Sequence, residues 1–102
     1  MLYMKSKWKV AIEKETESLI SRIFKVVVSD GGKKYSFRVE VDKNYSQELF
    51  GKEVTNLLLV QQSFMFLLEN EPVTSILRDF NLREIEQYFP QYEDNMKEVF
   101  LN

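Results

Sequence analysis

The stretch Leu57-Leu-Leu-Val-Gln-Gln-Ser-Phe-Met-Phe-Leu-Leu68 decides how the rest of the chain is arranged. Nine of its twelve residues are apolar, and only Gln61-Gln62-Ser63 interrupts them. Leu, Met and Gln favour a helix, and neither Gly nor Pro breaks the run. Thr55 offers a side-chain oxygen for the first amides, while Pro72 disfavours a helical residue before it. The sequence therefore predicts a central helix over about residues 55–70.

This helix is apolar around nearly its whole circumference. At about 100° per residue, five apolar residues share one dense face, namely Leu57, Val60, Phe64, Leu67 and Leu68. Leu59 and Phe66 point to roughly the opposite side. A helix that covers one sheet needs a single apolar stripe, so this opposite side requires a second cover. Either the C-terminal helices cover it within one chain, or a second copy of the chain does.

Two alternating runs before this helix predict an antiparallel hairpin, with strands over about residues 20–29 and 34–42. Between them, Asp30-Gly31-Gly32 supplies residues that adopt the backbone conformations of a tight turn. The alternation gives the hairpin one apolar face, made of Phe24, Val26, Val28, Tyr35, Phe37, Val39 and Val41. Because an isolated hairpin is marginally stable in water, we expect this face to pack on the central helix.

The N-terminal segment also alternates, with Trp8, Val10 and Ile12 on one side and charged residues on the other. We expect a first strand over about residues 7–13, followed by a polar turn over residues 13–18. The alternative is a charged N-terminal helix over residues 5–20. With the first strand present, the hairpin becomes a three-stranded meander.

The C-terminal third carries clear helix boundaries. Asn81 followed by Glu84 is a variant of the capping box, and Phe80 and Ile85 occupy the two positions of a hydrophobic staple. We expect one short helix at about residues 74–79, another from residue 82 that ends before Pro90, and a last amphipathic segment. The whole chain is thus predicted as one α+β domain over residues 1–102, in which the hairpin or meander packs on the central helix and two or three short helices follow.

Three short motifs in this region resemble a known pattern. They are Phe66-Leu-Leu-Glu-Asn-Glu-Pro72, Ser75-Ile-Leu-Arg-Asp-Phe80 and, after Ile85, Tyr88-Phe-Pro-Gln-Tyr92. Together with the hairpin before it, this block resembles a group of small uncharacterised proteins over roughly residues 23–93. The resemblance implies the order of hairpin and then helices. It implies no activity, cofactor or active-site residue.

Composition argues against an enzyme. The chain of 102 residues has no His and no Cys, which removes the commonest general base, the commonest metal ligand and every thiolate site. The carboxylates of Glu69 and Glu71, two residues apart on a helix, point about 200° away from each other. Ser63 has no His partner and no nucleophile turn around it. We therefore expect no catalysis, no cofactor and no metal site.

The location of the protein is also constrained by sequence. No apolar run approaches the roughly 18 to 20 residues that span a bilayer. Residues 1–9 lack the apolar stretch and small residues of a signal peptide. The absence of Cys fits a reducing compartment. We expect a cytoplasmic protein without membrane contact.

Charge is distributed unevenly although the net charge is only −2. Residues 1–34 hold eight Lys/Arg and four Asp/Glu (+4), residues 35–68 hold three and four (−1), and residues 69–102 hold three and eight (−5). We expect a protein-interaction or assembly module that forms a homodimer through Leu59, Phe66 and Val27, whose side chains are predicted to face away from the single-chain core. An unpaired hairpin edge is a second route to a dimer.

Nucleic-acid binding is the alternative function. Four cations, Lys25, Lys33, Lys34 and Arg38, are expected on the outer face and turn of the hairpin, where they would contact phosphates. Trp8 would be available to stack on a base. The sequence pI of about 5.2 argues against a dedicated nucleic-acid-binding protein.

Overall fold

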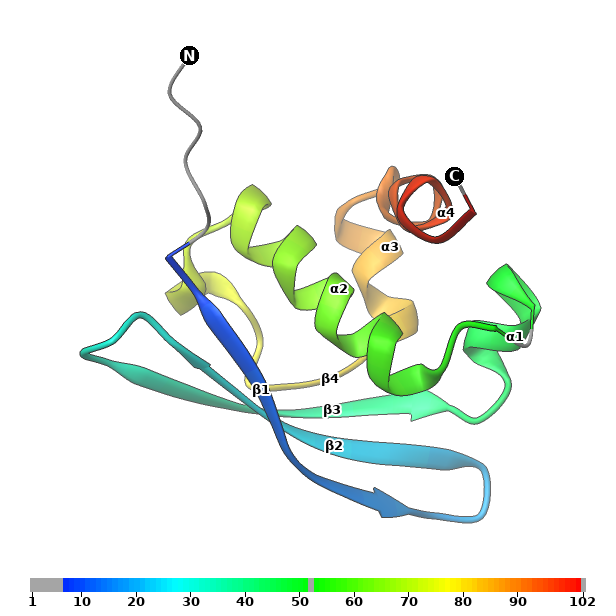
Figure 1. Ribbon diagram of the computed structural model, residues 1–102, viewed down its shortest axis with the longest axis horizontal. Coiled ribbons are helices and arrows are strands. Elements are labelled where there is room, and N and C mark those ends of the chain that lie inside the picture. The colour runs from blue at the N-terminus through cyan, green and yellow to red at the C-terminus, as the bar shows by residue number, and fades with distance from the viewer. Residues whose placement is uncertain (1–6, 52, 102) are drawn as a thin grey trace.

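The computed structural model describes residues 7–51 and 53–101. A four-stranded sheet lies below the central helix in Figure 1, and the C-terminal helix lies beyond that helix on the side away from the sheet. The strands are β1 (Lys9–Glu17), β2 (Ser21–Ser29), β3 (Lys34–Asp42) and β4 (Asp79–Asn81). The helical elements are α1 (Tyr45–Phe50), α2 (Asn56–Asn70), η1 (Val73–Ser75), η2 (Leu82–Glu84), α3 (Ile85–Tyr88) and α4 (Tyr92–Leu101). The predicted α+β class is confirmed.

Strands β1, β2 and β3 form the antiparallel meander that the alternation predicts. In the register of β2 and β3, Val26 pairs with Phe37 and Val28 with Tyr35. The predicted inward face is buried from Phe24 to Val41, except that Tyr35 is half-buried. Placing this face against α2 removes it from water, which is the main stabilising contribution to such a sheet.

Strand β1 is longer than predicted. It passes a bulge between Ile12 and Lys14 and continues to Glu17, so the polar turn expected over residues 13–18 is wrong. Beyond the bulge, the Glu15 carboxylate lies 2.8 Å from the guanidinium of Arg22 on β2, and the Glu17 carboxylate lies 2.8 Å from the Lys43 ammonium. Ion pairs of this kind, to the neighbouring strand and to the residue that follows β3, help a polar sequence to continue a strand. The alternative N-terminal helix is excluded for residues 9–17, while residues 1–6, including those considered for a signal peptide, lie outside the described part.

Helix α2 confirms the predicted boundaries. The Thr55 side chain accepts a hydrogen bond from the Leu58 amide at 3.2 Å, and the last helical residue is Asn70. Phe64 packs on the sheet, with its ring centre 5.1 Å from that of Phe37. Leu57, predicted on the dense face, is instead 38 % exposed. It lies in the first turn of α2.

The C-terminal third differs most from prediction. The helix expected over residues 74–79 is wrong: the chain makes one turn in η1 and then extends into β4, which pairs in parallel with β3. The open edge of β3 explains this, because the Arg38 amide donates a 2.7 Å hydrogen bond to the Arg78 carbonyl. The predicted cap at Asn81 is present, accepting from the Arg83 amide at 2.9 Å, and the helical segment that follows ends before Pro90 as expected.

Candidate interaction surfaces

The two α2 residues predicted to lie at a homodimer interface are covered by the chain itself. Leu59 is fully buried and Phe66 is 5 % exposed. The Phe66 ring makes edge contacts with Phe89 and Tyr92, at 5.7 and 5.4 Å between ring centres. The premise that these residues face away from the single-chain core is therefore wrong. The second cover that α2 requires comes from α4 and the end of α3.

Val27, the third predicted interface residue, does lie on the outer face of the sheet. It pairs with Ala11 on β1 and Ser36 on β3, yet it is only 8 % exposed. Longer side chains on the same face, including Lys25 and Arg38, lie beside it. An interface with a second copy must therefore use other residues.

A buried hydroxyl pair joins α2 to α4. Ser63 Oγ donates to the Leu59 carbonyl at 2.6 Å, so the Tyr92 hydroxyl, also 2.6 Å from Ser63 Oγ, is the donor between the two side chains. Burial raises the pKa of Tyr92 above its ordinary value, so the phenol remains neutral. Because these polar atoms bind each other, the pair secures helix packing. Ser63 has no access to a substrate.

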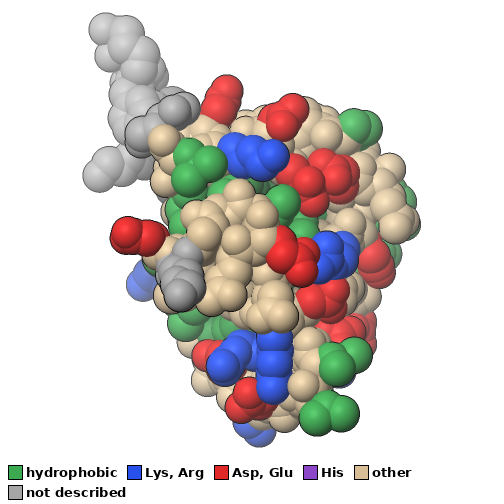
Figure 2. All heavy atoms as spheres, turned by 90° about the vertical axis from the view of Figure 1, so that its right-hand side faces the viewer, with side chains coloured by type: hydrophobic (Ala, Val, Ile, Leu, Met, Phe, Trp, Pro, Cys, Tyr) green, Lys and Arg blue, Asp and Glu red, His purple; other side chains and the backbone are tan. Residues whose placement is uncertain are grey.

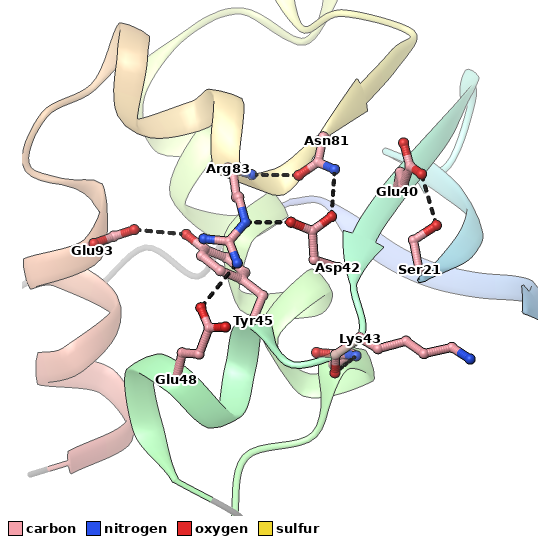
Figure 3. Close-up of polar contacts among 10 residues, drawn as sticks. Ser21, Glu40, Asp42, Lys43, Tyr45, Glu48, Asn81, Arg83 and Glu93 are labelled. Carbon is pink, nitrogen blue, oxygen red and sulfur yellow. Dashed lines mark hydrogen bonds and ion pairs between the residues drawn. The ribbon is translucent and has the colours of Figure 1, made fainter. Parts of the chain in front are cut away.

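The largest polar cluster centres on Arg83. Figure 3 shows its guanidinium between Asp42 and Glu48 and over the Tyr45 ring. It donates to Asp42, and to Glu48 Oε1 at 3.0 Å, and it lies 4.5 Å from the Tyr45 ring centre. The hydrogen bond from Arg83 holds the pKa of Asp42 below its ordinary value. No sequence pattern signals this cluster, because Arg83 follows Asp42 by 41 residues and Glu48 by 35 residues in the chain.

The contacts of the Arg83 cluster connect elements of the fold to one another. The Tyr45 hydroxyl extends it by donating to Glu93 Oε2 at 3.0 Å (Figure 3). Burial raises the pKa of Tyr45 above its ordinary value. Each group thus binds another group of the chain, and the cluster ties the end of β3 to α1, η2 and α4. No acid and base converge here on a shared open position of the kind that catalysis requires.

A row of cations crosses the outer face of the sheet. Lys14, Lys25 and Arg38 are direct cross-strand neighbours in β1, β2 and β3. Together with Arg78 they line a shallow hollow of about 450 Å³. Only two counter-charges reach the row among the described residues, with Glu13 3.7 Å from Lys25 and Asp79 3.0 Å from Arg38. Like charges placed directly opposite each other destabilise a sheet.

The residues predicted for nucleic-acid contact are only partly brought together. Lys25 and Arg38 lie in the row, and Lys34 begins β3 at one end of the same sheet. Lys33 lies in the turn, where its amide donates to the Asp30 carboxylate. Trp8 packs against the core, its ring 6.2 Å from that of Tyr35. Because Tyr35 faces the helix side with Val28, Trp8 lies on the opposite face from the row.

An apolar groove opens between the end of α2, the segment before β4, and α3. Its volume is about 340 Å³. Buried side chains form its floor, among them Leu67, Phe80 and Ile85. Leu77 and Tyr88 lie at its mouth and are 51 % and 66 % exposed. Sequence analysis does not find this groove because it depends on β4, where the pattern predicts a helix.

Two carboxylates line the same groove. They belong to Glu71, directly after α2, and Glu84, the last residue of η2. Partial burial raises the pKa of Glu71 above its ordinary value. An apolar groove with acidic side chains would accommodate an aliphatic group better than an anion.

A second exposed apolar feature is the turn between β1 and β2. Leu19 and Ile20 at its centre are 90 % and 73 % exposed. The Ser18 amide donates to the Ser21 carbonyl at 2.8 Å, and the Ser21 amide donates to Ser18 Oγ at 3.1 Å. Figure 2 shows apolar side chains standing out in small groups between charged ones on this side of the molecule. We call residues 18–21 the aliphatic tip.

Other kinds of site find little support in the geometry. Across residues 7–51 and 53–101, no group of three or more His, Cys, Asp or Glu side chains is placed to hold a metal ion. Within the same residues, no helix has the length and apolar character needed to cross a bilayer. Comparison with family models, with curated proteins and with solved structures finds no match.

Proposed function

We propose that this chain is a non-enzymatic protein-interaction module that self-associates through the apolar groove. The observation that carries the proposal is that Leu77 and Tyr88 remain more than half exposed at the mouth of a groove whose floor is apolar. An apolar recess with a few polar groups beside it is the usual form of a binding site. The absence of Cys fits a reducing compartment, and on that ground we place the module in the cytoplasm.

The polar residues support an interaction role over catalysis. The polar groups of the Arg83 cluster hydrogen-bond to one another, and so do the two hydroxyl groups of the Ser63–Tyr92 pair. A catalytic site needs groups whose reactive atoms are left free to meet a substrate. The groove offers apolar contacts and two carboxylates on separate elements, which suits recognition of a side chain.

The edges of the sheet make strand addition a poor route to self-association. β1 is an edge strand with a bulge after Ile12, and charged side chains run along it from Lys14 to Glu17. Bulges and charges are the devices by which edge strands avoid pairing with other chains. The other edge, β4, spans only Asp79–Asn81. Self-association is therefore better served by side chains in a groove than by extending the sheet.

Multi-angle light scattering across a concentration series tests this proposal. The wild-type mass should rise with concentration, and Leu77→Asp should abolish the rise, because a charge at the groove mouth opposes apolar contact. Val99→Asp is the matched control, since Val99 is 49 % exposed on α4 outside the groove. A strictly monomeric wild type up to hundreds of micromolar, roughly the range expected for a small interface, would overturn the proposal.

The cation row favours a second candidate function, the binding of nucleic acid through its phosphates. Lys14, Lys25 and Arg38 lie side by side, and the repulsion between their positive charges destabilises the sheet. A bound polyanion would reduce this repulsion. Because Trp8 lies on the other face, we expect no base stacking on this surface and no sequence preference.

Fluorescence anisotropy with a mixed-sequence oligonucleotide at low salt tests this second candidate. Affinity should fall steeply with salt, and Lys14→Glu with Lys25→Glu should abolish binding. Lys97→Glu, the same charge reversal on α4, should change it little. Absence of binding by the wild type at low salt would exclude the candidate.

A further inference from the structure

We propose that the aliphatic tip of one copy inserts into the apolar groove of a second copy, so that copies join head to tail. This inference rests on the proposed function and names its partner. The tip supplies a protruding apolar group and the groove supplies an apolar recess, and they share no residue. A single chain therefore carries both halves of one contact.

The turn does not need its two aliphatic side chains in order to form. Its hydrogen bonds come from Ser18 and Ser21, whose Oγ atoms lie 2.8 Å apart. Ser21 Oγ donates to Glu40 Oε2 at 2.8 Å, and the Lys43 amide donates to the Ile20 carbonyl at 3.1 Å. The backbone of the tip is thus fixed at both ends. Central turn positions normally hold Gly, Asn, Asp, Pro or Ser.

The aliphatic side chains also add little to the core. At 90 % and 73 % exposure, Leu19 and Ile20 keep most of their apolar surface in water. Burial of an aliphatic side chain is favourable, and these two residues gain it only from a contact outside the chain. A rigid backbone that presents two such side chains also loses little entropy on binding.

The groove fits such a partner in size and polarity. Its 340 Å³ lies within the range of about 300–1,000 Å³ typical of binding pockets, and its floor is made of buried Leu, Ile and Phe side chains. Leu77 and Tyr88 at the mouth would flank an inserted aliphatic group. Glu71 and Glu84 also line the groove.

The cations beside the tip are already paired within the chain. Arg22 lies 2.8 Å from Glu15, and Lys43 lies 2.8 Å from Glu17. The contact therefore depends on apolar groups, namely the two aliphatic side chains of the tip and the apolar floor of the groove.

A contact between two different surfaces has a distinctive stoichiometry. It is heterologous, so each copy in a pair still has one free tip and one free groove. Assembly then continues beyond two copies unless it closes into a ring. The area of one tip in one groove is small, so we expect weak association that is visible only in concentrated solution.

Complementation between two variants tests the inference. The tip variant carries Leu19→Asp with Ile20→Asn, both turn-compatible residues, and the groove variant carries Leu77→Asp. Neither should self-associate in light scattering. An equimolar mixture should associate and stop at twice the chain mass, because one intact groove meets one intact tip. Near-native far-UV circular dichroism and unchanged unfolding midpoints check that both variants are folded.

The remaining outcomes distinguish the inference from the proposed function. If the wild type and the tip variant associate equally while the groove variant does not, the proposed function stands and the tip is excluded as its partner. If neither variant associates and their mixture also stays monomeric, tip and groove do not meet and the inference is overturned. A monomeric wild type would remove the proposed function and the inference together.

Discussion

The two turns of the meander reverse the chain with residues of opposite character. The turn between β2 and β3 uses Asp30, Gly31 and Gly32, which are polar or lack a side chain. The turn between β1 and β2 places Leu19 and Ile20 at the centre and leaves the hydrogen bonds to the flanking serines. Both reverse an antiparallel pair in the same sheet.

The difference shows that turn formation and surface presentation can be separated. In the glycine turn, the Asp30 carboxylate accepts from the Gly32 and Lys33 amides, and the positive φ of +96° at Gly31 suits a residue without a side chain. In this turn, the residues either hydrogen-bond to the backbone or allow its conformation. In the aliphatic tip, the serines hydrogen-bond to the backbone, and the side chains of the central pair remain exposed.

Removing the anchor of the aliphatic tip should have the largest effect on stability. Ser21 is 1 % exposed, and Ser21→Ala leaves Glu40 and Ser18 without their partner. We expect a loss of about 1–3 kcal/mol in the free energy of unfolding, measured by urea denaturation. Ser29→Ala, the same truncation at the other end of β2, should cost less than about 0.5 kcal/mol. Equal losses of unfolding free energy in the two variants would show that the hydrogen bonds of the Ser21 side chain contribute no more to stability than the Ser29 side chain does.

The second-largest effect on stability is expected in the turn between β2 and β3, and only when Gly31 is replaced. Gly31→Ala forces a side chain into a φ of +96° and should cost roughly 1–2 kcal/mol. Gly32→Ala is its control, because the added Cβ would lie 3.9 Å from Asp30 Oδ1, an ordinary contact. That variant should keep its unfolding midpoint or raise it slightly, since it restricts the unfolded chain. A larger loss at Gly32 than at Gly31 would contradict this interpretation of the turn.

Acid should weaken the glycine turn. Hydrogen bonds from the Lys33 and Gly32 amides lower the pKa of Asp30 in the folded state. A lowered folded pKa stabilises the fold above the unfolded pKa, and this stabilisation is lost as pH falls through the folded pKa. Asp30→Ala should therefore unfold more readily than wild type near neutral pH, and the gap should narrow in urea titrations at progressively lower pH. If the difference in unfolding free energy between Asp30→Ala and wild type grew in acid, the stabilising role assigned to the Asp30 carboxylate would be refuted.

The smallest expected effect is at the tip itself. The Leu19→Asp and Ile20→Asn change should alter the unfolding free energy by less than about 0.5 kcal/mol, since these side chains are exposed. Differential scanning calorimetry of dilute protein, where association is absent, measures this directly. A loss above about 1 kcal/mol would mean that the pair stabilises the single chain, and the separation of roles between the two turns would fail.

Patterns with a clear period could be predicted from the sequence. The alternation from Phe24 to Val41 and the caps at Thr55 and Asn81 depend on neighbours close in the chain, and all are present. β4 could not be predicted, because three residues carry no period and the strand exists only where β3 offers an open edge. The exposure of Leu57 could not be predicted either, because the helical pattern places Leu57 on the dense face and does not say how far along the helix that face is covered.

The interaction surfaces were harder to predict. Leu59 and Phe66 have the composition of an interface, yet both are buried within the chain, and Tyr92 of α4 packs on Phe66, a contact between residues far apart in the chain. The tip did carry a local signal. Leu19 and Ile20 stand between two serines after a polar run, a pattern that favours an exposed turn. Assigning Ile20 to the start of a strand concealed it.

The parallel strand β4 also sets an order on folding. The meander joins neighbours in the chain, so it has low contact order and can form early. We expect β4 to reach β3 later than the meander forms, because the Arg38–Asp79 pair spans 41 residues of chain. Until then β3 presents a bare edge to the surroundings, and the emerging chain is most prone to aggregate in that interval. Chaperone demand should therefore be set by the time between synthesis of β3 and arrival of β4.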